Sequence, residues 1–345
     1  MKTALIIGIS GQDGSYLAEY LLEAGYAVHG LVRRASMFNR SRIDHLRLAT
    51  AEHQDRLFLH YGDLVDVTSL RRTLKKIAPH EVYHLAGQSH VGLSFEIPEV
   101  TCQENGMATL GLIEILRDLD SPVRLYNASS SEIFGAPPAS PQNEETSMNP
   151  VNPYGCAKAF GTQLCRVYRQ SYGLFVCNGI AYNHESPRRG ENFVTRKISL
   201  GAARIKLGQQ TVLELGNLDA RRDWGYAPEY VNAMWLMLQA ETPRDYVLAT
   251  GGTCSIRDFA IAAFDELRLG LRFEGRGVDE IGRRTDTGEV VVRVAARYFR
   301  PAESLELVGD ASLVRQTLGW TPKITGSGLA RLMAKADFEL LAADL

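Results

Sequence analysis

The sequence predicts an α/β fold, in which a doubly wound parallel sheet is joined by a smaller α/β lobe. A short apolar strand near the start of the chain runs directly into a glycine-rich turn and an amphipathic helix. Strand-like apolar runs then alternate with helical patterns through about residue 181, the order typical of a parallel sheet with helices on both faces. Beyond this point glycine, arginine and proline increase and the elements shorten, which indicates a second lobe.

The first strand is expected at 3–8 and the first helix at 16–25, with a GxxGxxG turn between them. Glycines in such a turn let the backbone approach a dinucleotide pyrophosphate, whose charge sits on the helix N-terminus. The candidate cofactor-binding residues of this turn are Gly8, Ser10, Gly11, Gln12, Asp13 and Gly14.

The second strand, expected at 27–32, ends in Arg33 and Arg34, and Ser36 follows. No Asp or Glu stands here to bind the ribose hydroxyls of NAD, whereas two guanidiniums and a hydroxyl suit a 2'-phosphate. The sequence therefore favours NADP. The alternative interpretation of Arg33 and Arg34 is a solvated basic turn.

Further strands are expected at 56–61, 81–86, 123–128 and 175–180. Ligands of doubly wound sheets gather at the carboxyl ends of the strands. The candidate cofactor positions there are Asp63, Leu64, Leu85, Gln88 and Ser89. We expect a Rossmann-type NADP-binding domain over 1–181, to which 226–250 return, and a substrate-binding lobe formed mainly by 182–225 and 251–345.

The candidate catalytic residues are Ser130, Glu132, Tyr154 and Lys158. Tyr154 and Lys158 stand four apart, so a helix presents both on one face, where an ammonium favours the phenolate and binds a cofactor ribose. Such a tyrosine takes a proton from a sugar hydroxyl while hydride leaves the same carbon. Glu132 adds a second acid/base group. The alternatives are a turn carboxylate for Glu132 and a hydroxyl that binds backbone for Ser130.

Composition limits the function classes. With 45% hydrophobic residues the chain can bury a large core, and a net charge of -2 gives no general attraction to nucleic acid or membranes. The longest apolar runs have strand length, so no membrane span or secretory signal is expected. Five cysteines without a CxxC pair favour reduced, mostly buried thiols over a disulfide framework or a zinc site. We expect a cytoplasmic protein that binds no metal.

Over almost its whole length the chain resembles the extended short-chain dehydrogenases, and within them the GDP-mannose 4,6-dehydratase family. The most specific motifs are NHESPRRG at 183–190 and GNLDARRDWG at 216–225. The other matching stretches are 8–16, 33–39, 61–64, 85–91, 128–135, 191–197 and 298–303.

This resemblance implies a bound NADP and a redox-neutral removal of water from GDP-mannose. Tyr154 with Lys158 would remove the O4 proton, Glu132 the C5 proton, and Ser130 with Glu132 would protonate the departing 6-hydroxyl. The resemblance also implies cofactor contacts from His184 and Arg189. The substrate-binding positions that it implies are Asn183, Lys197, Arg222, Arg300 and Glu303, with Arg196 beside Lys197 as a further basic group.

The chain departs from the family pattern at several positions. Val100 replaces a frequent Tyr, Ser130 a frequent Thr and Asn127 a frequent Gln, and Ala86 and Gly87 exchange the order seen in some relatives. These changes leave the reaction type in place but loosen the identity of the sugar on GDP. The resemblance of 33–42 to a loop that reaches a neighbouring subunit implies a homodimer or homotetramer.

Two other function classes stay open. An epimerase or decarboxylase on the same scaffold would use Tyr154 and Lys158 but would not need Glu132 beside Ser130. A catalytically silent nucleotide-binding regulator would lack one of the working groups, and this chain lacks none.

Overall fold

The computed structural model describes residues 1–34, 40–48, 53, 55–299 and 307–343. These residues form two compact units. Unit 1 comprises Met1–Tyr182, Ala227–Leu248 and Gly309–Thr321, and unit 2 comprises Asn183–Tyr226, Ala249–Val308 and Pro322–Leu345. Residues 309–321 thus belong to unit 1, whereas the sequence predicted a substrate-binding lobe formed mainly by 182–225 and 251–345.

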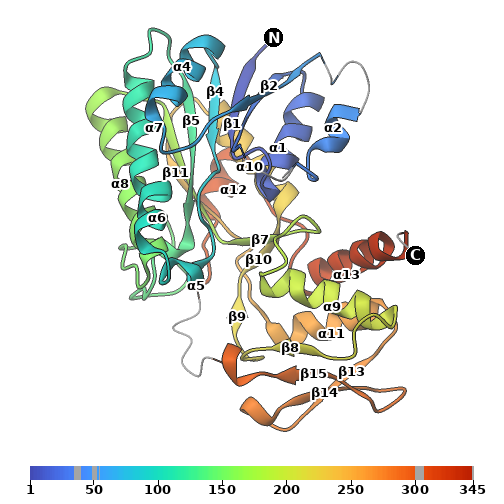
Figure 1. Cartoon of the computed structure of the whole chain (residues 1–345). Coiled ribbons are helices and arrows are strands. Elements are labelled where there is room, and N and C mark those ends of the chain that lie inside the picture. Colours follow the sequence, from blue (N-terminus) through green and yellow to red (C-terminus); the bar gives the residue numbers. More distant parts are fainter. Residues whose placement is uncertain (35–39, 49–52, 54, 300–306, 344–345) are drawn as a thin grey trace. The chain divides into compact units, whose positions relative to one another are not determined.

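Unit 1 contains the predicted doubly wound sheet, so the expected fold class is confirmed (Figure 1). Its seven strands are all parallel, in the order β11-β6-β5-β4-β1-β2-β3. The strands are β1 (Thr3–Ile7), β2 (Ala27–Val32), β3 (Leu57–Tyr61), β4 (Glu81–His84), β5 (Arg124–Ser130), β6 (Val176–Ala181) and β11 (Asp245–Leu248). The apolar runs of the sequence form strands because helices bury both faces of such a sheet.

The helices of unit 1 form one layer on each face of the sheet (Figure 1). Helices α4 (Val67–Ile77), α7 (Ala108–Arg117) and α8 (Pro153–Tyr172) pack together on one face, and α1 (Gln12–Glu23) packs with α10 (Ala227–Gln239) on the other. The shorter elements are α2 (Asp44–Leu48), α5 (Val91–Ser94), α6 (Pro98–Cys102), the π-helical turn η1 (Gln103–Met107), the 3-10 turn η2 (Ser131–Ile133) and α12 (Ser312–Leu318).

Aromatic packing explains why residues 309–321 join unit 1. Trp320, just beyond α12, packs edge-on against Tyr230 of α10 with ring centroids 5.3 Å apart. Its Nε1 also donates a hydrogen bond to the carbonyl of Glu229 at 2.8 Å. A buried indole needs a large apolar partner and an acceptor for its N–H, and α10 supplies both.

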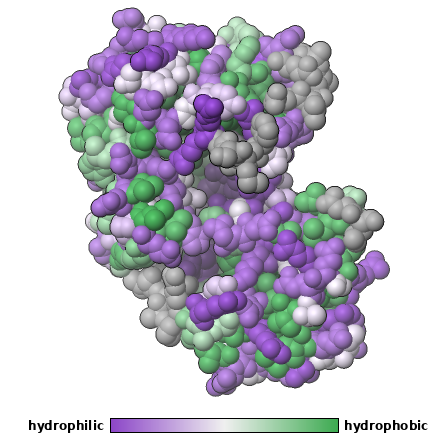
Figure 2. Space-filling view, in the orientation of Figure 1, coloured by the Kyte–Doolittle hydropathy of each residue, from purple (hydrophilic) through white to green (hydrophobic). Residues whose placement is uncertain are grey.

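An exposed apolar strip lies on the outside of the α6–α8 region of unit 1. Val100, Met107, Phe160 and Val167 are each about half exposed. Phe160 and Val167 are seven residues apart on α8, so they lie on one face of that helix. Val100 and Met107 lie on α6 and η1, both of which pack against α8. Phe160 lies against η1, because a Cβ added to Gly106 would meet its ring at 3.1 Å. Figure 2 shows apolar side chains gathered over this part of unit 1.

Unit 2 is built on a four-stranded sheet in the order β13-β14-β15-β8, covered by three helices. Its sheet strands are β8 (Leu213–Leu215), β13 (Leu271–Glu274), β14 (Ile281–Arg284) and β15 (Val290–Val294), and its helices are α9 (Val194–Lys206), α11 (Ile256–Glu266) and α13 (Gly326–Ala343). Two short pairs complete it: β7 (Asn183–Glu185) with β10 (Trp224–Tyr226), and β9 (Arg221–Arg222) with β12 (Cys254–Ser255). The 3-10 turns η3 (Gly277–Asp279) and η4 (Ala296–Tyr298) flank the sheet strands.

All five cysteines are free thiols. Cys165, Cys177 and Cys254 are buried, whereas Cys102 and Cys156 are exposed. Among the described residues no helix is both long enough and apolar enough to cross a membrane.

Candidate active site

The turn between β1 and α1 has the shape that the glycine pattern predicts. Gly8 has a φ of +99°, and a Cβ on Gly14 would lie 2.2 Å from the Gly8 carbonyl oxygen. Neither position has room for a larger side chain. Gly11 is the N-cap of α1, so the helix begins without a side-chain cap, and its N-terminal partial charge faces the turn. This cradle fits a pyrophosphate.

The other predicted residues of this turn belong to the same loop and the first turn of α1. Gln12 is buried and donates from Nε2 to Asp13 Oδ1 at 2.9 Å. The Ser10 carbonyl accepts a hydrogen bond from Arg42 at 3.4 Å. Arg42 thus contacts the backbone of the turn from outside it.

At the end of β2, Arg33 lies between two carboxylates. Its Nη2 donates to Glu104 Oε1 at 2.6 Å, and its Nε lies 3.4 Å from Asp63 Oδ2. The hydrogen bond to Glu104 raises the pKa of the Arg33 guanidinium. Arg34 is exposed, and Ser36 lies outside the described residues. The structure thus brings the predicted positions Arg33 and Asp63 together.

The segment after β4 continues the same edge of the sheet. The Leu85 amide donates to the Ile7 carbonyl at 2.9 Å. Gln88 closes a local turn, with Oε1 accepting from the His90 amide at 2.5 Å and Nε2 donating to the His90 carbonyl at 2.9 Å. Ser89 is exposed. Leu64 is buried in the apolar core, so its side chain faces the interior and only its backbone is available to a ligand.

Tyr154 and Lys158 lie on the first turns of α8. The Tyr154 side chain is buried, with 8% of its surface exposed, and Lys158 is partly buried. Lys158 Nζ donates to the carbonyl of Ala128 on β5 at 2.8 Å and lies 5.7 Å from the centre of the Tyr154 ring. Burial lowers the pKa of the Lys158 ammonium to about 8. The helix thus holds the phenol and the ammonium against the last strand residues of β5.

Ser130 and Glu132 lie at the carboxyl end of that strand. Ser130 ends β5, and its Oγ accepts the amide of Glu132 at 3.2 Å. A Cβ on Gly155 would lie 2.5 Å from the Glu132 carbonyl oxygen, so α8 approaches η2 as closely as backbone allows. Ser130, Glu132, Tyr154 and Lys158 therefore form one cluster.

Asn152, which the sequence did not predict as a site residue, joins the two halves of this cluster. Its Nδ2 donates to Glu132 Oε2 at 2.8 Å, and its Oδ1 accepts the Gly155 amide at 2.7 Å as the N-cap of α8. The signal was present, because Asn followed by Pro at the start of a helical pattern is typical of an N-cap. The contact with Glu132, in contrast, depends on the fold.

The remaining candidates lie in unit 2. Asn183 and His184 are on β7, paired with Trp224 and Gly225 of β10. Arg189 binds Glu185 through Nε at 3.0 Å and stacks on Phe193.

Lys197 on α9 has its Nζ 3.9 Å from the centre of the Tyr298 ring, and burial lowers the pKa of its ammonium. Arg222 donates from Nη1 to the Arg221 carbonyl at 2.7 Å. Arg300 and Glu303 lie outside the described residues.

Arg196 does not have the diphosphate-binding role that the family resemblance implied. Its guanidinium is buried against Asp337 of α13, which also accepts a hydrogen bond from Ser199 at 2.5 Å. Because this ion pair ties α9 to α13 inside the core of unit 2, the guanidinium is not open to a diphosphate. Lys197, the next residue, lies on another side of α9 and stays a predicted substrate-binding residue.

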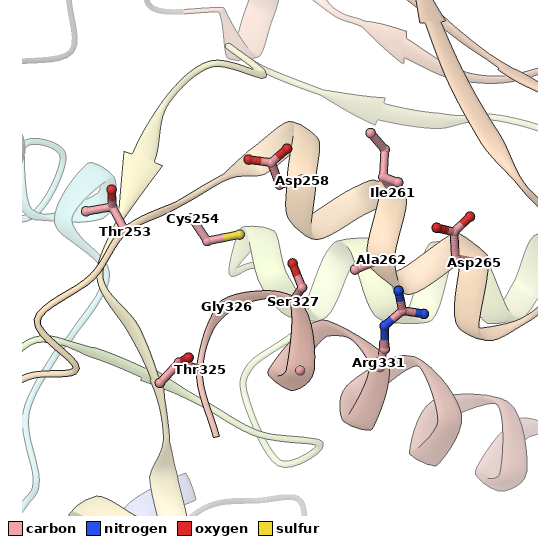
Figure 3. A pocket seen from close by; sticks show the side chains of 11 residues that line it. Thr253, Cys254, Asp258, Ile261, Ala262, Asp265, Thr325, Gly326, Ser327 and Arg331 are labelled. Atoms are coloured by element: carbon pink, nitrogen blue, oxygen red, sulfur yellow. The ribbon is translucent and has the colours of Figure 1, made fainter. Parts of the chain in front are cut away.

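Unit 2 also contains a cavity of about 520 Å³ between α11 and the start of α13 (Figure 3). Asp258, Asp265 and Arg331 line it, together with Cys254 and Ser327. None of the predicted site residues lines this cavity.

The chain matches the family described as GDP-mannose 4,6 dehydratase over residues 5–333. It is 50% identical to a GDP-mannose 4,6 dehydratase of Drosophila melanogaster over 343 residues, which cover 99% of this chain and 87% of that protein. It is 48% identical to a GDP-mannose 4,6 dehydratase of Homo sapiens over 343 residues, 99% of this chain and 92% of the other.

Solved structures show the same fold at lower identity. A dTDP-glucose 4,6-dehydratase from Streptomyces venezuelae, with NAD and TYD bound, has a TM-score of 0.80 at 22% identity, covering 99% of this chain and 98% of the other. The RMD protein of Pseudomonas aeruginosa, complexed with NADPH, has a TM-score of 0.76 at 24% identity, covering 99% and 100%. Because the family match spans nearly the whole chain and relatives from two animals share about half of its residues, the chain belongs to the GDP-mannose 4,6-dehydratase family.

Proposed function

We propose that this protein is a lyase that removes water from GDP-mannose without net redox change, giving GDP-4-keto-6-deoxymannose. The observation that carries the proposal is the carboxylate of Glu132, held by Asn152 at 2.8 Å beside Ser130 and the Tyr154/Lys158 pair. A simple dehydrogenase or epimerase needs no second base at this place, whereas a dehydratase does. Family membership supports the same reaction.

The cofactor of this proposal is NADP. The cradle formed by Gly8, Gly11 and Gly14 would hold its pyrophosphate, and Arg33 and Arg34 its 2'-phosphate. Leu85, Gln88 and Ser89 would line it further along the sheet edge, and His184 and Arg189 of unit 2 are proposed as additional contacts. Bound NADP would supply the hydride chemistry of the reaction, in which the C4 hydride of the sugar would be taken up and returned at C6 with no net change of the cofactor.

The residues of the chain divide the proton transfers between them. Tyr154 takes the O4 proton as the C4–H bond breaks, and the Lys158 ammonium stabilises the phenolate by its charge. The new 4-ketone acidifies the C5 proton, and Glu132 takes it. The C6–O bond then breaks, and the departing hydroxyl receives a proton from Glu132 with the help of the Ser130 hydroxyl, leaving as water.

Basic and polar residues of unit 2 are proposed to bind GDP-mannose. Arg222 and Arg300 would hold the diphosphate, since a guanidinium binds phosphate oxygens in a bidentate way, and Lys197 adds a point charge. Asn183 and Glu303 would accept hydrogen bonds from sugar hydroxyls or base amino groups.

We further propose that the protein is a homodimer or homotetramer. The exposed apolar strip of Val100, Met107, Phe160 and Val167 supports a second copy of this chain as the partner, because two such helical faces bury each other when related by a two-fold axis. Light scattering of the parent and of Phe160→Glu tests this: the proposal expects an oligomer that the charged variant dissociates. A monomeric parent would refute it.

The experiment that tests the activity is incubation of the purified protein with GDP-mannose and no added NADP. The expected product has lost the mass of one water, because the resident cofactor is recycled. UDP-glucose and dTDP-glucose are assayed alongside. A product of unchanged mass would favour an epimerase, and faster turnover of either other nucleotide sugar would refute the GDP assignment.

A further inference from the structure

A row of buried polar side chains crosses the central sheet of unit 1 next to the catalytic helix. His84, Asn127, Asn178 and Asp245 are direct Cα partners on β4, β5, β6 and β11. Their exposed fractions are 2%, 3%, 0% and 8%. Buried positions of parallel strands usually carry apolar side chains. Burying four polar side chains here costs desolvation free energy, which their hydrogen bonds or a functional role must offset.

The row lies on the face of the sheet that α7 and α8 cover. The residues two positions earlier on three of these strands, Val82, Leu125 and Val176, pack in one apolar core with residues of α7 and of α8. Side chains alternate between faces along a strand, so residues two apart share a face. His84, Asn127 and Asn178 therefore face the helix layer.

Hydrogen bonds join three members of the row, Asp245, Asn178 and Asn127, starting from the carboxylate. Asp245 Oδ1 accepts from Asn178 Nδ2 at 2.8 Å, and Asn178 Oδ1 accepts from Asn127 Nδ2 at 2.8 Å. Arg166 Nε donates to Asp245 Oδ2 at 2.5 Å, and Arg169 binds the other carboxylate oxygen. Because a carboxylate only accepts, Asp245 fixes the orientation of the Asn178 amide, which in turn fixes that of Asn127.

The same row binds α8, the helix that carries Tyr154 and Lys158. Asn178 Nδ2 also donates to the Thr162 carbonyl at 3.2 Å, and Thr162 Oγ1 lies 2.7 Å from Ser129 Oγ on β5. Lys158, Thr162, Arg166 and Arg169 are three or four residues apart, so α8 presents one polar face to the sheet along its length.

His84 ends the row on the side of the catalytic lysine. Burial and the charge of Lys158 lower the pKa of the His84 imidazole to about 3. His84 therefore stays neutral and adds no second positive charge beside Lys158. Its Nδ1 has no hydrogen-bond partner among the described residues.

We propose that the row His84–Asn127–Asn178–Asp245 is a positioning device for the catalytic pair, which fixes the rotation and register of α8 on β5 and β6 and so places Tyr154 and Lys158. This inference rests on the proposed function. Apolar contacts alone permit several similar packings of a helix on a sheet, whereas directional hydrogen bonds to Thr162 and ion pairs to Arg166 and Arg169 permit one. Asn178 and Asp245 touch no reacting group, and they act through the helix.

The test compares Asp245→Asn and Asn178→Ala with the control Glu280→Gln. Glu280 is also a buried carboxylate paired with an arginine, Arg257, but it lies in unit 2 outside the proposed site. For each variant we would measure the urea unfolding midpoint, kcat and KM for GDP-mannose at a temperature where all variants are folded, and the pH dependence of kcat.

The proposal predicts that kcat falls about tenfold or more in both row variants, because small misplacements of reacting groups reduce rates strongly. KM should stay within about twofold of the parent value. The basic limb of the pH profile should shift as well, because a displaced α8 would weaken the hydrogen bond from Lys158 Nζ to the Ala128 carbonyl. The control should lose stability but keep its kcat and its pH profile. Row variants that keep kcat within about twofold of the parent, or a control that loses as much, would overturn the proposal.

A substrate-free readout separates this inference from the proposed function. The titration of the Lys158 ammonium is followed by NMR of lysine-labelled protein, with Lys158→Met used for assignment. A titration midpoint of Lys158 that moves in Asp245→Asn but not in Glu280→Gln supports the positioning role of the row. This holds even if the parent does not turn over GDP-mannose, because absence of turnover would count against the proposed function alone. An unchanged midpoint would refute the positioning role.

Discussion

Replacing Asn152 with serine should slow dehydration while leaving α8 capped, because the two ends of this side chain serve different partners. Oδ1 accepts the Gly155 amide at 2.7 Å, and a serine hydroxyl can take over this N-cap contact. Nδ2 donates to Glu132 Oε2 at 2.8 Å, and serine has no group that reaches as far.

The magnitudes follow from these two contacts. Loss of an N-cap costs about 1 kcal/mol. A hydrogen bond to a charged group contributes about 1.5–3 kcal/mol, and the low end applies because Glu132 is partly exposed and water replaces the amide. Asn152→Ala should therefore lose about 2–3 kcal/mol of unfolding free energy, and Asn152→Ser about half of that.

The catalytic effect should be the same in both variants. Without the amide, the Glu132 carboxylate is no longer oriented, and we expect kcat to fall about tenfold, a part of the hundredfold or more that a general base contributes. Asn152→Asp keeps the cap but sets a second carboxylate beside Glu132, which disfavours the ionised base and should move the acid limb of the kcat profile to higher pH.

The assays are urea unfolding for stability and steady-state turnover of GDP-mannose for kcat. The orienting role of Asn152 is refuted if Asn152→Ser keeps kcat within about twofold of the parent, since the contact with Glu132 is then dispensable. It is also refuted if the loss of kcat follows the loss of stability across the three variants, because the cap would then explain both.

Four further predictions follow from other parts of the site. Glu132→Gln should accumulate reduced cofactor on addition of GDP-mannose in stopped-flow absorbance, whereas Tyr154→Phe should show none; identical traces would contradict the division of the two proton transfers. Because Arg33 and its neighbour favour a 2'-phosphate, the nucleotide released by denaturation should have the mass of NADP, and recovery of NAD alone would reject this cofactor. Arg222→Lys should raise KM for GDP-mannose far more than it lowers kcat, since a point charge cannot replace a bidentate guanidinium; a selective loss of kcat would place Arg222 elsewhere. Burial lowers the pKa of His84 to about 3, so between about pH 6.5 and pH 3 the unfolded chain binds a proton at this residue and the folded chain does not. The free energy of unfolding therefore decreases as pH falls through this range. The loss is about 2 kcal/mol between about pH 7.5 and about pH 5, and His84→Asn should reduce this difference in urea midpoints; an equal pH dependence in the variant would contradict it.

The sequence alone determined the features that depend on neighbouring residues. The apolar runs between residues 3 and 181 predicted the parallel sheet, because fully buried strands show no alternation. The glycine spacing predicted the turn after β1, where a Cβ on Gly14 has no room. The spacing of Tyr154 and Lys158 predicted that both lie on one face of a helix, since three or four residues make one turn.

Only the tertiary structure decided which distant residues meet. Asn152 reaches Glu132 because α8 begins beside the end of β5, and Arg196 is buried because α9 packs on Asp337 of α13. Residues 309–321 join unit 1 through Trp320, which no local pattern predicts. The row from His84 to Asp245 exists because four strands align in register. Such contacts depend on strand order and helix packing, which are set by the burial of the whole core rather than by any short segment.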